Sequence, residues 1–70
     1  MILIVVKFRT KPEYTERWPE IVDEFTRATR AEPGNIFFEW SRSLETKDEW
    51  VLVEAFQDDA AEAHVGSDHF

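Results

Sequence analysis

The sequence predicts a small α+β domain in which an antiparallel sheet carries helices on one face. Three observations lead to this fold class. Residues 2–9 are an apolar run rich in β-branched side chains, and residues 14–29 carry apolar side chains at helical spacing. Residues 36–43 and 49–56 are rich in aromatic or β-branched side chains and lie on either side of a polar turn, so that each is expected to be a strand whose even- and odd-numbered side chains point to opposite faces. A period of two is typical of strands, and a recurrence every three or four residues is typical of amphipathic helices.

The first two elements are expected to be a strand over residues 2–9 and a long helix beginning near Glu13 or Tyr14. The strand starts as a continuous apolar run, which favours a strand covered on both faces. Pro19 is expected to kink the helix in its first turns. The apolar stripe of the helix assigns its large side chains to the core; its members are Tyr14, Trp18, Ile21, Val22, Phe25, Ala28 and Thr29.

The second half of the chain is expected to begin with a hairpin. Residues 31–35 (Ala-Glu-Pro-Gly-Asn) end the helix, because proline and glycine together do not continue it. Residues 36–43 and 49–56 then form two strands that pair with each other. A short helix over residues 60–64, capped by an aspartate, is expected to follow.

The resulting order, β-α-β-β-α, is that of a ferredoxin-like fold without its final strand. We treat residues 1–70 as one such domain. In the ferredoxin-like topology the sheet order is 4-1-3-2, so the missing strand would pair with the first one. Residues 2–9 would otherwise be an exposed apolar edge. We therefore expect either that the sequence is a truncated form of a longer domain, which we favour, or that a neighbouring molecule covers this edge.

The composition argues against several classes of partner. Eight basic and fifteen acidic residues give a net charge of −7, which repels nucleic acid and anionic membranes. The apolar start is too short to span a membrane and has no signal-peptide pattern. With no cysteine present, nothing points to an oxidising compartment. We therefore expect a cytoplasmic protein that acts on small molecules. The chain also has ten aromatic residues (three Trp, six Phe and one Tyr), so we expect it to share apolar surface with other chains in an oligomer.

The two histidines, His64 and His69, are the candidate catalytic residues. In a chain without cysteine, imidazoles are the side chains that ordinarily titrate near neutrality. His69 is the leading candidate base, and a surface or capping role is the alternative for both residues. Side chains five apart on a helix do not form the clamp that an i, i+4 pair forms. We therefore expect no metal site.

The candidate substrate-binding residues are Asn35, Phe38, Trp40, Glu54 and Phe56. Asn35 could hydrogen-bond a substrate oxygen, or it could simply favour the turn after glycine. Phe38 and Trp40 share a strand face and could wall an aromatic ligand, although core or interface packing explains them equally well. Glu54 lies between apolar residues and needs a partner. Arg42 on the neighbouring strand is the expected one, in a structural ion pair.

Several segments together resemble a known family. They are Ala31-Glu-Pro-Gly-Asn35, Phe38-x-Trp-x-Arg-Ser43, Glu54-x-Phe56 and His64-x-x-Ser67-x-His69-Phe70. The sequence resembles the antibiotic biosynthesis monooxygenase (ABM) domain, most closely its quinol-monooxygenase branch. This resemblance implies ferredoxin-like protomers that pack their sheets face to face as a dimeric α+β barrel. It also implies oxidation of small aromatic quinols or phenols by O2 without metal, flavin or haem.

Two other functions remain open from the sequence. The first is a non-catalytic dimeric module that binds a small molecule, as many small ferredoxin-like domains do. The second is haem degradation, a different branch of the same family, whose members resemble one another in using an Asn on the first strand. Residues 2–9 contain no Asn, so this branch is the less favoured one.

Overall fold

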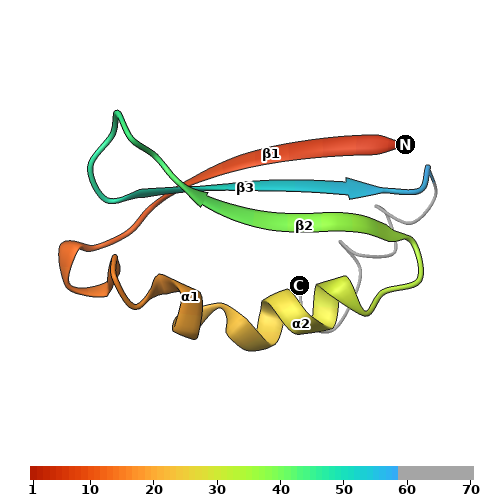
Figure 1. Ribbon diagram of the computed structural model, residues 1–70, viewed down its shortest axis with the longest axis horizontal. Coiled ribbons are helices and arrows are strands. Elements are labelled where there is room, and N and C mark those ends of the chain that lie inside the picture. Colours follow the sequence, from red (N-terminus) through yellow and green to blue (C-terminus); the bar gives the residue numbers. More distant parts are fainter. Residues whose placement is uncertain (59–70) are drawn as a thin grey trace.

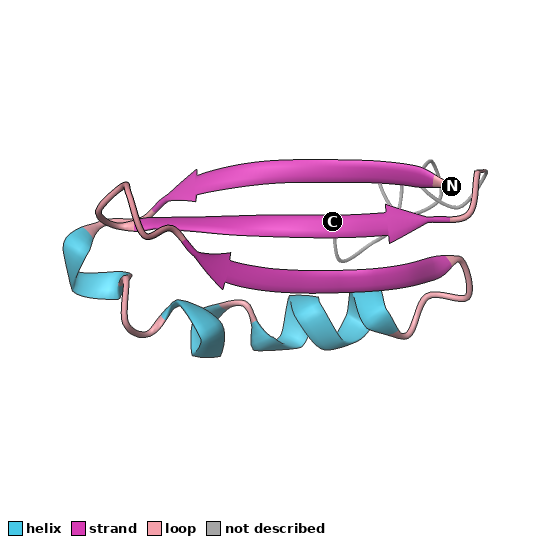
Figure 2. Ribbon diagram, turned by 45° about the horizontal axis from the view of Figure 1, so that its top comes forward, coloured by secondary structure: helices cyan, strands magenta, loops and turns pink. Residues whose placement is uncertain are grey.

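The computed structural model describes residues 1–58 of the 70-residue chain. Its elements are, in order, β1 (Ile2–Arg9), the 3-10 turn η1 (Pro12–Tyr14), α1 (Trp18–Ile21), α2 (Asp23–Arg30), β2 (Asn35–Arg42) and β3 (Glu49–Phe56). The helical segments all lie on one side of the sheet (Figures 1 and 2). The α+β class is confirmed, and the three strands begin and end within one residue of their predicted limits. The helix expected over residues 60–64 lies outside the described residues.

The three strands form one antiparallel sheet in the order β1-β3-β2. This is the order that the ferredoxin-like topology predicts for the first three strands. The register pairs Ile4 with Glu54 on one side of β3 and Phe38 with Glu54 on the other. Because paired residues point to the same face of a sheet, Glu54 faces the helices together with Ile4 and Phe38.

The two faces of the sheet have different surroundings. On the face toward the helices, Phe38, Leu52 and Phe56 are buried. On the other face, which we call the open face, Leu3 and Val5 keep 55% and 56% of their surface exposed. The expectation that β1 is covered on both faces is therefore wrong for residues 1–58. All the helical segments of residues 1–58 lie along the same face of the sheet. None of them covers the open face.

The apolar stripe predicts a single long helix, but the structure has three shorter segments, η1, α1 and α2. The prediction of one continuous helix is therefore wrong. Pro19 lies in the first turn of α1, where its missing N–H would have no helical partner in any case. It begins a helix instead of kinking one. Val22, with φ −97° and ψ 7°, separates α1 from α2. Trp18 and Phe25 still pack against the sheet, but both are half-buried.

A polar network fastens the β2–β3 turn to the chain that follows β1. The Thr15 hydroxyl, in a residue only 2% exposed, donates to Oδ1 of Asp48 at 2.7 Å. The Asp48 carbonyl accepts a bond from the backbone N–H of Thr10 at 2.8 Å. The indole of Trp50 donates to the Thr15 carbonyl at 3.0 Å. These bonds fix the end of β1 relative to η1, where the groove described below begins.

Candidate functional site

A groove lined by aromatic side chains lies between the sheet and the helices. Its volume is about 410 Å³, within the range of small-molecule sites. The lining residues are Phe8, Trp18, Ile21, Val22, Phe25 and Trp40. They come from β1, β2 and both helices, because the apolar stripe of the helical segments faces the apolar face of the sheet. We call this space the aromatic groove.

Three rings form one wall of the aromatic groove. Trp40 lies 5.4 Å from Phe8 and 5.9 Å from Trp18, between ring centroids, and the two indoles meet edge to face at 88°. Such tilted and edge-to-face arrangements are favourable for aromatic rings. Trp40 is also held from the helix side, since its Nε1 donates to Oγ1 of Thr26 at 2.9 Å. The groove therefore has a wall whose orientation is set by both layers.

Trp18 contributes the one polar atom of this wall that has no hydrogen-bond partner among residues 1–58. Its Nε1 is buried there without an acceptor. An unsatisfied buried donor costs about 1–3 kcal/mol, and such atoms are rare in folded proteins. A ligand oxygen that reached this N–H would recover part of that cost.

A second hollow adjoins the aromatic groove at the η1 end of the molecule. It measures about 490 Å³ and is lined by Arg9, Thr10, Lys11, Tyr14, Trp18 and Ile21. Trp18 and Ile21 belong to both linings, so the two spaces are neighbours along the same side of the sheet. We call this second space the basic hollow, after Arg9 and Lys11.

The candidate residues on the strands share the helix-facing side of the sheet, as their spacing predicts. Of these, Trp40 lines the aromatic groove. Phe38 and Phe56 are 1% and 0% exposed, and the Phe38 ring lies behind the lining, tilted against Phe25 at 5.8 Å and edge to face with Trp40 at 5.9 Å between ring centroids. Glu54 is 5% exposed, so this carboxylate lies in the apolar layer between sheet and helices.

Asn35 is engaged with the backbone at the start of β2. Its Nδ2 donates to the carbonyl of Phe37 at 3.1 Å and to that of Ala55 at 3.5 Å. The strand register shifts between Asn35 and Phe37, and these bonds bridge that irregularity. In this structure the side chain serves the turn, which is the alternative considered from the sequence.

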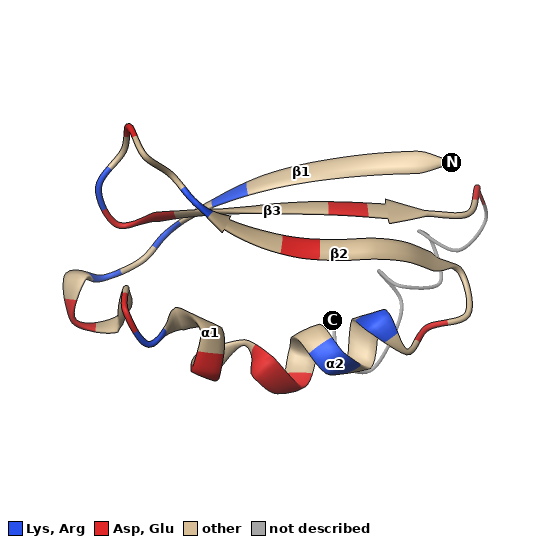
Figure 3. Ribbon diagram, in the orientation of Figure 1, with Lys and Arg blue, Asp and Glu red and all other residues tan. Residues whose placement is uncertain are grey.

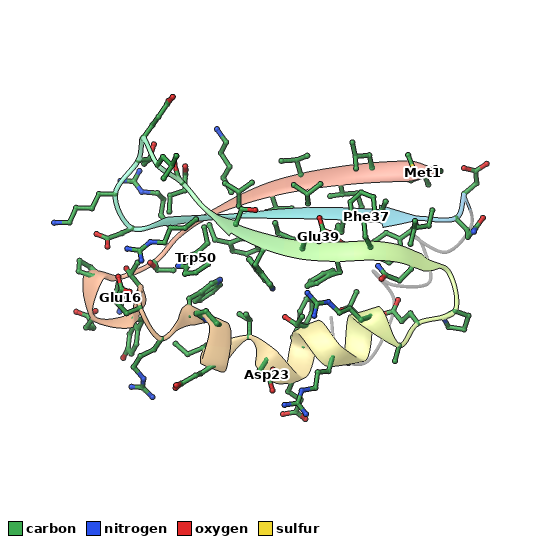
Figure 4. The ribbon with its side chains drawn as sticks, viewed as in Figure 1. Met1, Glu16, Asp23, Phe37, Glu39 and Trp50 are labelled. Carbon is green, nitrogen blue, oxygen red and sulfur yellow. The ribbon has the colours of Figure 1, made fainter. Side chains whose placement is uncertain are left out.

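The expected ion pair between Arg42 and Glu54 is wrong. Nη1 of Arg42 lies 2.7 Å from Oε1 of Glu16, and its guanidinium lies 5.7 Å from the ring centre of Trp50. The register explains this result, because Arg42 is opposite Trp50 whereas Glu54 is opposite Phe38. Figure 4 labels Glu16 and Trp50 at the end of the molecule where β3 begins.

The two candidate catalytic histidines, His64 and His69, lie outside the described residues. Within residues 1–58, no group of three or more His, Cys, Asp or Glu side chains is placed to hold a metal ion. In the same part of the chain, no helix is long and apolar enough to cross a membrane.

Comparison with known proteins identifies the family. The family model for antibiotic biosynthesis monooxygenases matches residues 1–70. The chain belongs to this family. The resemblance inferred from the sequence motifs is thereby confirmed at the level of the family. No curated protein matches the chain significantly.

Solved structures of several similar proteins share the fold. A conserved protein from Methanosarcina mazei Go1 is 26% identical, with a TM-score of 0.85 over 97% of this chain and 68% of that one. A protein from Nitrosomonas europaea, assigned to the antibiotic biosynthesis monooxygenases, is 28% identical, with a TM-score of 0.83 over 99% and 74%. Rv0793 from Mycobacterium tuberculosis is 26% identical, with a TM-score of 0.78 over 96% and 68%. These similarities support the ferredoxin-like assignment of this ABM chain.

Sequence reasoning missed part of the groove lining. The sequence pattern assigns Phe8 only to the first strand, and it assigns Trp18 and Phe25 only to the core. For Phe8, the sequence does carry a signal: alternate residues of a strand point to the same face, so Phe8 faces the same side of the sheet as Ile4 and Val6. For the division of the helix, Pro19 signalled an interruption in the first turns but not the break at Val22.

Proposed function

We propose that this ABM protein is a cofactor-independent monooxygenase that oxidises a small aromatic quinol or phenol with O2. The observation that carries the proposal is the aromatic groove, whose rings Phe8, Trp18 and Trp40 offer flat apolar surface to an aromatic ligand. Family membership supports an oxygenase.

The reaction needs a base and an apolar site more than it needs a cofactor. Removal of the phenolic proton gives an anion that is electron-rich enough to transfer an electron to O2. Bond formation between the ring carbon and oxygen gives a hydroperoxide. Loss of water from that hydroperoxide leaves a carbonyl, so that a phenol with a free para carbon and O2 give a para-quinone and water. A hydroquinone that reacts at a free ring carbon next to an oxygen gives a hydroxyquinone and water in the same way. The substrate itself supplies the electrons that reduce the second oxygen atom.

In this proposal His69 accepts the phenolic proton, and His64 is the second candidate for that role. The aromatic groove has no titratable lining residue among residues 1–58, so the base must come from elsewhere. Trp40 contacts the ring, with Phe38 and Phe56 behind it, and the Glu54 carboxylate and Asn35 amide are the remaining candidate substrate contacts.

Oxygen consumption with a panel of hydroquinones tests this function. We expect His69→Ala to lower kcat/KM about 100-fold or more, the usual contribution of a general base, with His64→Ala as the matched comparison. The loss should shrink at high pH, where the quinol ionises without help. If wild-type protein consumes no O2 with any quinol, or if both variants keep the wild-type rate, the proposal is wrong.

The alternative function is a non-catalytic module that binds the same ligands. The purely apolar and aromatic lining of the groove favours binding as much as chemistry. Tight binding of a hydroquinone under argon, followed by no O2 uptake in air, would favour this function over oxygenation. Haem degradation is less favoured because β1 contains no Asn. Titration with haemin is expected to leave its Soret band unshifted.

We also propose that two copies of this chain pack open face against open face. The open face carries Leu3, Val5, Phe37, Val51 and Val53, which is a large apolar surface for a protein of this size. Lys7 and Glu39 lie on the same face with opposite charges, so the surface is electrostatically complementary to a second copy of itself.

Sedimentation equilibrium tests the dimer with two matched variants. Val5→Glu places a charge on the open face, whereas Leu44→Glu makes the same kind of change in the β2–β3 turn, where Leu44 is fully exposed. We expect wild type and Leu44→Glu to be dimeric and Val5→Glu to be monomeric. Equal masses for Val5→Glu and wild type would refute the open-face interface.

A further inference from the structure

The basic hollow places two cations beside an aromatic site in an acidic protein. The whole chain carries a net charge of −7, yet Arg9 and Lys11 both line this space. Arg9 ends β1 and Lys11 directly precedes η1; Figure 3 shows basic positions in this stretch of the ribbon, and acidic positions at η1 as well as along α1 and the start of α2. Two positive charges therefore line this end of the groove, while the adjoining η1 carries Glu13.

Neither cation is neutralised within residues 1–58. The ion pairs in this part of the chain involve the amino terminus, Arg17, Arg27 and Arg42. Glu49 is opposite Arg9 in the strand register, but the two side chains form no ion pair. Both basic residues are exposed, so their apolar stems can line the hollow while their charged ends remain in water. Their charges are available to an incoming anion.

We infer that the ligand of this site is an aromatic acid, with its ring in the aromatic groove and its carboxylate at Arg9 and Lys11. This inference rests on the proposed function and narrows its substrate class to quinols or phenols that carry a carboxylate. The two spaces share Trp18 and Ile21, so a ligand with a carboxylate beside its ring spans both. A guanidinium binds a carboxylate through two parallel hydrogen bonds, and a lysine adds a second charge.

Binding of 2-naphthoate and 2-naphthamide to the full chain tests this inference without any turnover. The two probes differ in charge, and neither has a phenolic group to be oxidised. Quenching of tryptophan fluorescence reports their affinities, since Trp18 and Trp40 line the groove. We expect naphthoate to bind roughly fivefold to tenfold more tightly than naphthamide, the combined effect of two exposed charge pairs. Added salt should reduce that preference.

A pair of double variants separates local from overall charge. Arg9→Gln/Lys11→Gln should abolish the preference for naphthoate, measured as the ratio of the two probes' affinities for the same variant. Arg27→Gln/Lys47→Gln removes the same charge from residues that line neither space and should keep the preference. Circular dichroism confirms that each variant is folded.

Three results would overturn the inference: equal affinities of the two probes for wild type, equal effects of the two double variants, or no binding of either probe. These results are independent of oxygenation. If naphthoate preference depends on Arg9 and Lys11 but no quinol consumes O2, the carboxylate site is supported and the proposed function fails.

Discussion

Asp48, in the turn between β2 and β3, has a backbone φ of 57°. This left-handed conformation is costly for most residues but tolerated by aspartate and asparagine. The same residue accepts the hydroxyl bond of Thr15 and the backbone bond of Thr10. Asp48 therefore permits the turn and, through its carboxylate and its backbone carbonyl, ties it to the segment that borders the basic hollow.

Substitution of Asp48 should show both roles. Asp48→Ala loses one hydrogen bond, about 1 kcal/mol, and puts alanine in a left-handed conformation at about 1 kcal/mol more. Asp48→Asn keeps an acceptor oxygen and tolerates the conformation, so it should lose less than half as much. Urea unfolding at neutral pH measures both free energies. Equal losses in the two variants would contradict this account.

Asp58 gives the protein a defined response to acid. The hydrogen bond from the Met1 ammonium group, followed by its positive charge, lowers the pKa of Asp58 from the ordinary value of 3.8. A carboxyl whose pKa is lower in the folded state stabilises the fold above its unfolded-state pKa. That contribution is lost as the pH falls through the lower folded-state pKa.

We therefore expect Asp58→Asn to flatten the acid side of the stability profile. Between about pH 5 and pH 2, the melting temperature of wild type should fall further than that of Asp58→Asn. The difference should be small, because both partners are exposed to solvent. Thermal unfolding followed by circular dichroism gives both curves, and parallel curves would show that the Met1–Asp58 contact does not act in solution.

At the scale of elements, α2 is fastened to β2 by side-chain hydrogen bonds as well as by apolar packing. Nε and Nη2 of Arg30 both donate to the carbonyl of Phe38, at 3.0 and 2.9 Å. Phe38 in turn lies against Phe25 of α2. The helix is thus held to the strand by polar and aromatic contacts at the same point, which keeps the rear of the aromatic groove in place.

Arg30→Gln should destabilise the protein more than Arg27→Gln does. The first change removes bonds to a backbone carbonyl and should cost about 1 kcal/mol. The second removes an exposed i, i+4 pair with Asp23 on the same helix, which is worth about 0.3 kcal/mol. Both remove one positive charge, so they are matched in charge. Denaturant unfolding measures the difference, and the interpretation fails if Arg27→Gln is as harmful as Arg30→Gln.

At the scale of the whole molecule, the sheet has one face covered by helices and one open face. If the open faces pair as proposed, folding and association are linked, and the melting temperature should rise with protein concentration. For a chain of this size, a hundredfold increase should raise it by about 5 °C or more. The melting temperature of Val5→Glu should not depend on concentration. Differential scanning calorimetry tests this, and a concentration-independent wild type would argue against the dimer.

The sequence determined the class of fold, the three strands and their faces. Strand periodicity placed Phe38, Trp40 and Glu54 on one face, because alternation depends on local backbone geometry alone. The motifs around Ala31–Asn35 and residues 36–43 were sufficient to indicate the family. The acidic balance was likewise a property of composition.

Only the tertiary structure decided how these elements meet. The strand register placed Arg42 opposite Trp50 and thereby separated it from Glu54. The break at Val22 divided the helix, and the packing of its pieces on the sheet made the groove at Trp18. Register, helix breaks and grooves depend on contacts between residues far apart in the chain, which a local pattern of apolar and polar residues does not encode.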